Sequence, residues 1–298
     1  MHIALVYAGG AEALAMSLGE RWVNLSRAHQ DYERDVEDRE IAPVRDLFSL
    51  VNAGLFTCSF YRRMTEFVQR HDRFQDYLIP EDARFLAPLR PPKIIAIGRN
   101  YRAHVAEFDN QMPTEPIFFA KAPSACIGPG EAIVVQEWHG RVDHEGELGV
   151  IIGKRARNVP PEHVRDYIAG YTIVNDVTAR DIQKKDIGAG NPWFRSKSID
   201  TFCPFGPVVA MADALPWPVA VDIEVRVNGQ VRQKSNTEKF LFPIPELIAA
   251  VSRFMTLYPG DLIATGTPEG VSPIHAGDVV EVIIPEIGVL KNPVVSGD

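Results

Sequence analysis

The chain has 298 residues, of which 46% are hydrophobic and 23% charged, a composition typical of a globular protein with ample material for a core. Its formal net charge of -8 argues against a nucleic-acid partner, because nucleic-acid-binding proteins usually carry a basic excess that meets phosphates. The three cysteines, Cys58, Cys126 and Cys203, are far apart and show no CxxC spacing, which argues against a disulfide framework or a zinc knuckle.

The sequence starts without the pattern of a secretory leader. The stretch MHIALVYAGGAEALAM has no basic segment followed by an unbroken apolar run. No uninterrupted apolar stretch elsewhere is long enough to span a bilayer. We therefore expect a cytoplasmic protein with no membrane partner.

Residues 1–90 predict a small N-terminal α/β domain. The expected elements are a strand at His2–Tyr7, a turn at Gly9-Gly10, a second strand near Glu20–Leu25, a charged surface stretch at Asp31–Glu40, and a helix from Phe60 to Val68 that ends near His71. The domain boundary is predicted at Pro88-Leu89-Arg90-Pro91-Pro92, because proline disfavours regular helix and favours an extended link.

The sequence pattern of residues 91–298 predicts a larger domain that is rich in strands. Apolar or alternating runs predict strands at Lys93–Ile97, Leu148–Ile152, Tyr171–Asn175, Asp222–Val227, Gln230–Gln233, Leu262–Thr265, Val279–Ile284 and Val289–Val295. Asn228-Gly229 joins two of these runs and indicates a tight hairpin, since a type I′ turn needs positive φ at both central residues. One helix is expected after Pro245, where apolar residues recur at helical spacing until Tyr258-Pro259-Gly260.

Three carboxylates mark a candidate metal site. Glu145 and Glu147 alternate along a predicted strand and would point the same way, while Asp176 follows the strand Tyr171–Asn175. Neighbouring carboxylates repel each other unless one is protonated or a cation lies between them. An all-oxygen ligand set favours Mg²⁺, Mn²⁺ or Ca²⁺ over Zn²⁺ or Cu²⁺. The alternative is that both glutamates lie on a solvated face of the sheet.

The segment IGRNYRAHVAE contains a candidate general base. His104 and Glu107 are three residues apart and would be neighbours on a helical turn. A carboxylate beside a histidine orients the ring and raises its basicity. The alternative is an ordinary ion pair on an exposed helix.

Several blocks of the sequence resemble the fumarylacetoacetate hydrolase family. In chain order these blocks are IGRNYRAHVAE, PIFFAKAPSACIGPG, VDHEGELGVIIGK, VNDVTARDIQ, RSKSIDTFCPFGP, VNGQVRQKSNT and PGDLIATGTPEGV. Together they cover roughly residues 93–295. The first 90 residues share no usable part of this resemblance.

The resemblance implies a fold and a set of site residues. The implied fold is α+β and mostly β, a mixed β-roll with one metal at its mouth. We expect the small N-terminal domain at residues 1–90 and this roll at residues 91–298. The implied metal ligands are Glu145, Glu147 and Asp176, with Mg²⁺ or Mn²⁺ as the cofactor and Ca²⁺ as a third option. The implied catalytic residues are His104, Glu107 and Lys197, and the implied substrate-binding residues are Tyr101, Lys121, Gln183 and Thr267.

The resemblance also implies an activity on a small oxo acid. The leading hypothesis is hydrolysis of a C–C bond in a 2,4-dioxo acid, an acylpyruvate or a fumarylacetoacetate-like acid, through a metal-bound enolate. The alternative is an isomerase or decarboxylase in aromatic catabolism, because the fold does not choose among these reactions. It would act on a 2-oxo or hydroxymuconate-type diacid, including oxaloacetate. A non-catalytic ligand-binding member of the fold is the third. We further expect a homodimer, and a distal-group specificity set by residues 107–112 and by residues 1–90.

Overall fold

The structure is a computed structural model that describes residues 1–70, 74–107 and 111–297. The predicted helix end at His71 and part of the predicted specificity segment 107–112 lie outside the described residues. Among the described helices, none combines the length and the hydropathy that crossing a membrane requires. The predicted homodimer stays a prediction, since the structure holds one chain.

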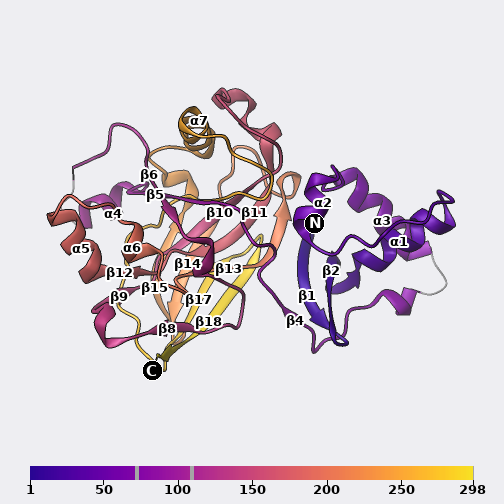
Figure 1. The fold of residues 1–298 in the computed structure, drawn as a ribbon, viewed down its shortest axis with the longest axis horizontal. Helices are drawn as coiled ribbons and strands as arrows, with labels where there is room; N and C mark the ends of the chain where they lie inside the picture. The colour runs from indigo at the N-terminus through magenta and orange to yellow at the C-terminus, as the bar shows by residue number, and fades with distance from the viewer. Residues whose placement is uncertain (71–73, 108–110, 298) are drawn as a thin grey trace.

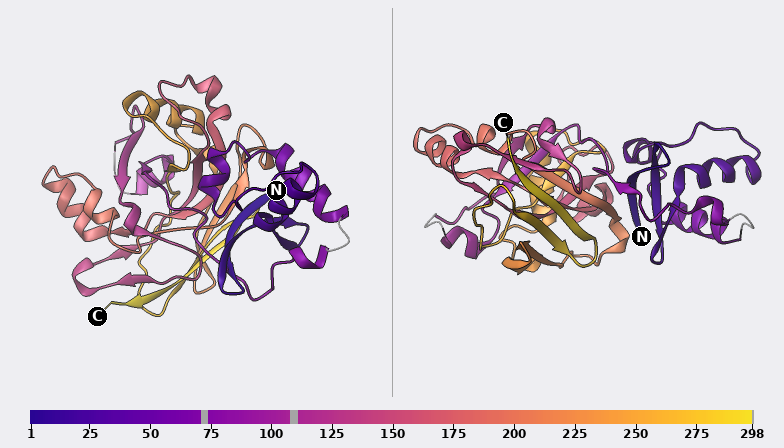
Figure 2. Two further views of the ribbon diagram at one scale, coloured as in Figure 1. Left: turned by 45° about the vertical axis from the view of Figure 1, so that its right-hand side comes forward. Right: turned by 90° about the horizontal axis from the view of Figure 1, so that it is seen from below.

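The N-terminal residues form a small sheet with helices beside it (Figure 1). Its elements are β1 (His2–Ala8), β2 (Ala11–Leu18), β3 (Arg21–Asn24), α1 (Leu25–Asp35), α2 (Leu47–Asn52), α3 (Cys58–Arg70), a 3₁₀ turn (Phe74–Tyr77) and β4 (Arg84–Phe85). The stretch predicted to lie on the surface begins inside α1, where Asp31 is buried and accepts a hydrogen bond from Tyr77 Oη at 2.9 Å. Figure 2 shows this unit beside the rest of the molecule, and β1 continues into the main sheet by antiparallel pairing with β13.

The larger part of the chain is built on two sheets. The main sheet continues from β1 through β13 (Cys203–Met211), β11 (Ile168–Asn175), β10 (Gly146–Ile152), β16 (Leu262–Ala264), β5 (Ile94–Gly98) and β6 (Ile117–Lys121). The second sheet has the order β15 (Gln230–Asn236), β14 (Asp222–Val227), β17 (Val279–Ile284), β18 (Gly288–Ser296) and β8 (Ile133–Val135). The mixed fold with more strand than helix confirms the predicted fold class.

Short elements complete this part of the fold. They are β7 (Cys126–Ile127), β9 (Val142–Asp143), β12 (Thr178–Ala179), α4 (Arg102–Glu107), α5 (Arg180–Gly188), α6 (Phe194–Lys197) and α7 (Ile244–Phe254). The predicted hairpin at Asn228-Gly229 is confirmed, with positive φ of 52° and 76° at the two turn residues. The predicted helix after Pro245 is α7, which ends at Phe254, before Tyr258.

A glycine brings the two sheets together beneath the candidate metal ligands. Gly146 opens β10, and a Cβ atom added there would overlap the Val225 side chain of β14 and lie 3.0 Å from Val282 of β17. The small residue therefore lets the second sheet pack closely against β10. Because side chains alternate along a strand, Glu145 and Glu147 face away from this contact.

We expect Gly146→Ala to destabilise the fold by about 1–3 kcal/mol, the usual cost of adding a carbon to a packed core. Urea unfolding of the metal-free protein would measure this cost. Gly188→Ala is the matched control, because Gly188 lies in helix α5 with nothing within 4 Å of an added Cβ, so that alanine should be neutral or stabilising there. Equal stability of the two variants would contradict tight packing at Gly146.

Candidate metal centre and catalytic cavity

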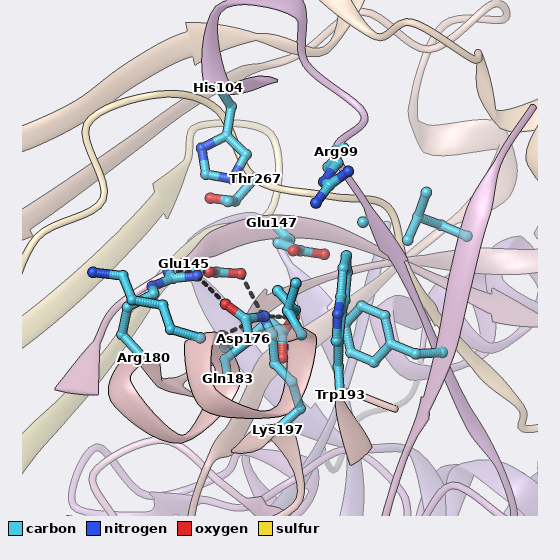
Figure 3. A pocket seen from close by; sticks show the side chains of 15 residues that line it. Arg99, His104, Glu145, Glu147, Asp176, Arg180, Gln183, Trp193, Lys197 and Thr267 are labelled. Atoms are coloured by element: carbon cyan, nitrogen blue, oxygen red, sulfur yellow. Dashed lines mark hydrogen bonds and ion pairs between the residues drawn. The ribbon is translucent and has the colours of Figure 1, made fainter. Parts of the chain in front are cut away.

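A cavity of about 230 Å³ opens at the ends of the main-sheet strands, between α4, α5 and α6 (Figure 3). It is lined by Ile97, Gly98, Arg99, His104, Phe119, Glu145, Glu147, Asp176, Arg180, Gln183, Lys184, Ile187, Trp193, Lys197 and Thr267. This volume is below the ~300–1,000 Å³ of typical ligand pockets, which suits a small substrate. The cavity gathers most of the residues that the sequence singled out.

The three predicted metal ligands meet at the floor of this cavity. Carboxylate oxygens of Glu145, Glu147 and Asp176 lie within 4.8 Å of one another, and all three side chains are buried. Strand register brings them together, because Gly146 of β10 pairs with Asn175 of β11. The residues on either side of that pair are then neighbours, and the Asp176 N–H donates to the Glu145 carbonyl at 2.8 Å.

Two cations compensate part of this negative charge. Lys197 Nζ donates to Glu145 Oε2 and to Asp176 Oδ2, both at 2.6 Å, and Arg180 Nη2 donates to Glu145 Oε1 at 2.5 Å. Burial alone would raise the pKa of Glu145, but Lys197 and Arg180 outweigh burial and lower it. Burial likewise opposes the charge of Lys197, yet Asp176 and Glu145 raise the pKa of its ammonium group. Both groups are therefore held in their charged forms.

Glu147 is the least compensated of the three carboxylates. Its Oε2 accepts a hydrogen bond from the Gly266 N–H at 2.8 Å, and it forms no ion pair with any residue that the structure describes. Burial, together with the nearby charges of Asp176 and Glu145, raises the pKa of Glu147 well above its usual value. A divalent cation among the three carboxylates relieves this repulsion, and an oxygen-only donor set suits a hard cation. The residues present therefore fit a Mg²⁺-type or Mn²⁺-type ion.

The predicted His104–Glu107 pair lies at the opposite wall, on helix α4. His104 Nδ1 is 3.2 Å from Glu107 Oε2, and Glu107 Oε1 accepts from the Gly270 N–H at 3.2 Å. The ring of His104 lines the cavity above the carboxylates (Figure 3). Glu107 thus links the histidine to the loop that carries Thr267, an arrangement that can orient a general base.

The other predicted substrate-binding residues differ in their placement. Gln183 lines the cavity, and its Oε1 accepts from Arg180 Nη1 at 2.7 Å. Thr267 also lines it, but its hydroxyl donates to the Gly146 carbonyl at 2.9 Å and accepts from Gln233 Nε2 at 2.8 Å. These bonds already use the hydroxyl proton.

Lys121 and Tyr101 lie outside the cavity wall. Lys121 Nζ is buried behind Asp176 and donates to its Oδ1 at 2.5 Å, so the lysine positions a metal ligand instead of facing the substrate. The Tyr101 ring is buried against Phe240, with ring centroids 5.0 Å apart. Both side chains are buried against other groups of the protein, and neither lines the cavity.

The sequence reasoning missed three cavity residues. Arg180 stands in the quoted block VNDVTARDIQ, four residues after Asp176, and its ion pairs with Glu145 and Asp143 could not be read from spacing. Arg99 stands in IGRNYRAHVAE, where a left-handed backbone, with φ of 59°, is the local sign of a special position. Trp193 follows Pro192 and precedes α6, and no local pattern marked it as part of a site.

Comparison with known proteins extends these observations. The family profile described as "Fumarylacetoacetate (FAA) hydrolase C-terminal" matches residues 93–295. The mitochondrial oxaloacetate tautomerase of Xenopus laevis is 38% identical over 271 residues, which cover 85% of this chain and 84% of that protein.

Several solved structures match this chain over its whole length and over their own, among them the following two enzymes. The 5-carboxymethyl-2-hydroxymuconate delta-isomerase from Mycobacterium smegmatis is 34% identical with a TM-score of 0.74. The maleylpyruvate hydrolase from Sphingobium sp. SYK-6, in complex with manganese(II) and pyruvate, is 32% identical with a TM-score of 0.75. The named relatives are thus enzymes that act on small oxo or hydroxy acids by different reactions.

Proposed function

Since the chain belongs to the fumarylacetoacetate hydrolase family, we propose that it is an enzyme that hydrolyses a C–C bond in a small 2,4-dioxo acid with the help of Mg²⁺ or Mn²⁺. The observation that carries this proposal is the His104–Glu107 pair facing three buried carboxylates across one cavity. The matching structure with manganese(II) and pyruvate supports it, because pyruvate is the product expected from an acylpyruvate.

Glu145, Glu147 and Asp176 would hold the ion through their facing oxygens. When bound, the cation supplies Lewis-acid stabilisation for the negative charge that develops on the 2-oxo end of the substrate. His104 removes a proton from water, and that water attacks the distal carbonyl carbon. The C–C bond then breaks, one product leaves as a carboxylic acid, and the electron pair remains on the pyruvate-like product, which takes up a proton.

Lys197 and Gln183 serve the same reaction from the floor of the cavity. An ammonium group has three donors, and two of those of Lys197 go to Glu145 and Asp176. Nζ also lies 3.5 Å from the Asp176 carbonyl oxygen, and its positive charge at the cavity wall stabilises negative charge on the substrate oxygen. Gln183 keeps its amide N–H groups for the substrate, because its carbonyl oxygen accepts from Arg180.

Isomerisation or tautomerisation of a 2-oxo diacid is the second candidate function. The X. laevis tautomerase and the M. smegmatis isomerase favour it. The same groups suffice, because His104 then moves a proton between carbon and solvent instead of activating water. The two candidates therefore differ in whether water enters the product.

Turnover in water enriched with ¹⁸O separates them. For maleylpyruvate, a dicarboxylic acylpyruvate, with Mg²⁺ or Mn²⁺, hydrolysis places one solvent oxygen in the released maleate, which mass spectrometry detects. Oxaloacetate in deuterated water is the parallel substrate, on which a tautomerase exchanges the C3 protons without cleavage. Rapid deuterium exchange with no cleavage of any acylpyruvate would replace the hydrolase proposal by the tautomerase.

A further inference from the structure

The cavity has two chemically different halves. The carboxylates and Arg180 line the charged part, the apolar side chains Ile97, Phe119 and Trp193 line the other, and Lys197 lies where they meet, with Nζ 5.3 Å from the centre of the Phe119 ring. Figure 3 shows Arg99 and Trp193 on the same side, opposite Arg180 and Glu145. A substrate whose 2-oxo acid end lies at the carboxylate triad therefore extends its distal part toward Arg99 and Trp193.

Trp193 is a fixed wall of this half. A Cβ atom added at Gly98 would lie 2.5 Å from the indole ring, so that the absence of a side chain there permits the observed position of Trp193. The ring also meets Phe119 edge to face, with centroids 5.4 Å apart. Packed on two sides, the indole offers a flat apolar surface to a planar or unsaturated carbon chain.

Arg99 places a positive charge beside this wall. Its Cζ lies 5.6 Å from the centre of the Trp193 ring, a contact that orients the guanidinium plane. The described residues offer it no ion-pair partner, whereas Arg180 and Lys197 are both paired with carboxylates. Partial burial lowers the pKa of Arg99, as expected for a cation that lacks an anion. The in-plane N–H groups of an arginine fit a carboxylate with two parallel bonds.

We propose that Arg99, held beside Trp193, binds the distal carboxylate of the substrate, so that the enzyme selects dicarboxylic oxo acids over monocarboxylic ones. This inference rests on the proposed function in one respect, namely that the 2-oxo acid end occupies the carboxylate triad. It adds the class of substrate to the proposed function, because the sequence did not indicate which chemical group the substrate carries at its distal end.

Calorimetric binding with Mg²⁺ present tests the assignment on a matched ligand pair. The two ligands are 2-oxoadipate and 2-oxohexanoate. They have the same chain length and differ only in the distal carboxylate, which 2-oxohexanoate lacks. We expect the diacid to bind about 10- to 100-fold more tightly to the wild type, the usual worth of a hydrogen bond to a charged group. Arg99→Asn should remove this preference and leave the Kd of the monoacid unchanged.

The variants are chosen to separate binding from folding. Asparagine tolerates positive φ better than most residues, so Arg99→Asn avoids strain at a φ of 59°, and Arg99→Lys should keep part of the preference. Arg102→Asn is the control, because Arg102 is exposed at the start of α4 and does not line the cavity. Oxalate, which reaches only the metal end, should bind wild type and Arg99→Asn equally.

Two results would overturn the inference: a wild type that binds both oxo acids equally, or an Arg99→Asn variant that weakens both by the same factor. Failure of the proposed function looks different. If no 2,4-dioxo acid is cleaved but the preference for the diacid depends on Arg99, the hydrolase proposal falls while the specificity assignment stands.

Discussion

The Glu147→Gln variant is expected to lose divalent-metal binding and activity together while remaining folded. Glutamine keeps the shape of the side chain and can still accept the Gly266 N–H bond, but it removes one of three anionic oxygens from the site. Lewis-acid stabilisation is worth several kcal/mol, and each ~1.4 kcal/mol is a factor of ten. We therefore expect turnover to fall by about 10²- to 10³-fold or more.

The melting temperature of Glu147→Gln provides a second measurement, which distinguishes loss of the metal site from damage to the fold. Glu147 is buried beside Glu145 and Asp176, without an ion pair of its own among the described residues. Removing its charge should therefore leave the melting temperature of the metal-free protein unchanged or higher. Added Mg²⁺ or Mn²⁺ should raise the melting temperature of the wild type and not that of the variant.

Asp176→Asn should behave differently, which makes it a useful comparison. Asp176 accepts from both Lys121 and Lys197, two buried lysines. Taking one charge from a buried ion pair typically costs ~3–5 kcal/mol, so that this variant should lose stability as well as metal. Unchanged metal affinity in Glu147→Gln, measured by calorimetry, would remove Glu147 from the ligand set.

Local patterns predicted much of this fold. Alternation and turn residues located β14, β17 and the hairpin at Asn228-Gly229, because these features depend on neighbours in sequence. Strand β2 was missed since its Ala, Glu, Leu and Met residues favour helix, and its pairing with β1 overrides that preference. Strand β13 was missed because Pro204 and Pro207 argue against a central strand.

The candidate site shows the same division. The spacing of Glu145 and Glu147, and of His104 and Glu107, is local and could be read directly. The meeting of Asp176 with Glu145 depends on the register of β10 against β11, which only the family resemblance supplied. The ion pairs of Lys121 and Arg180 with the carboxylates cross 55 and 35 residues of chain, and no local pattern indicates which cation lies behind a ligand and which one faces the cavity.

His104→Ala is expected to lower turnover by about 10²- to 10⁴-fold, the usual contribution of a general base. The reason is geometric: His104 lines the cavity, and Glu107 lies 3.2 Å from its Nδ1, where a carboxylate orients the ring and raises its basicity. Metal affinity should barely change, because the histidine does not belong to the carboxylate triad. Steady-state kinetics and calorimetry on the same preparation check both halves of this expectation.

The control for this experiment is His163→Ala, because His163 is exposed and does not line the cavity. It should turn over acylpyruvate at the wild-type rate. Decarboxylation of oxaloacetate gives a further comparison, since loss of CO₂ needs no activated water and should suffer less from His104→Ala than hydrolysis does. Near-normal hydrolysis of the best acylpyruvate by His104→Ala would contradict the assignment, because no other side chain of the described cavity wall pairs an imidazole with a carboxylate.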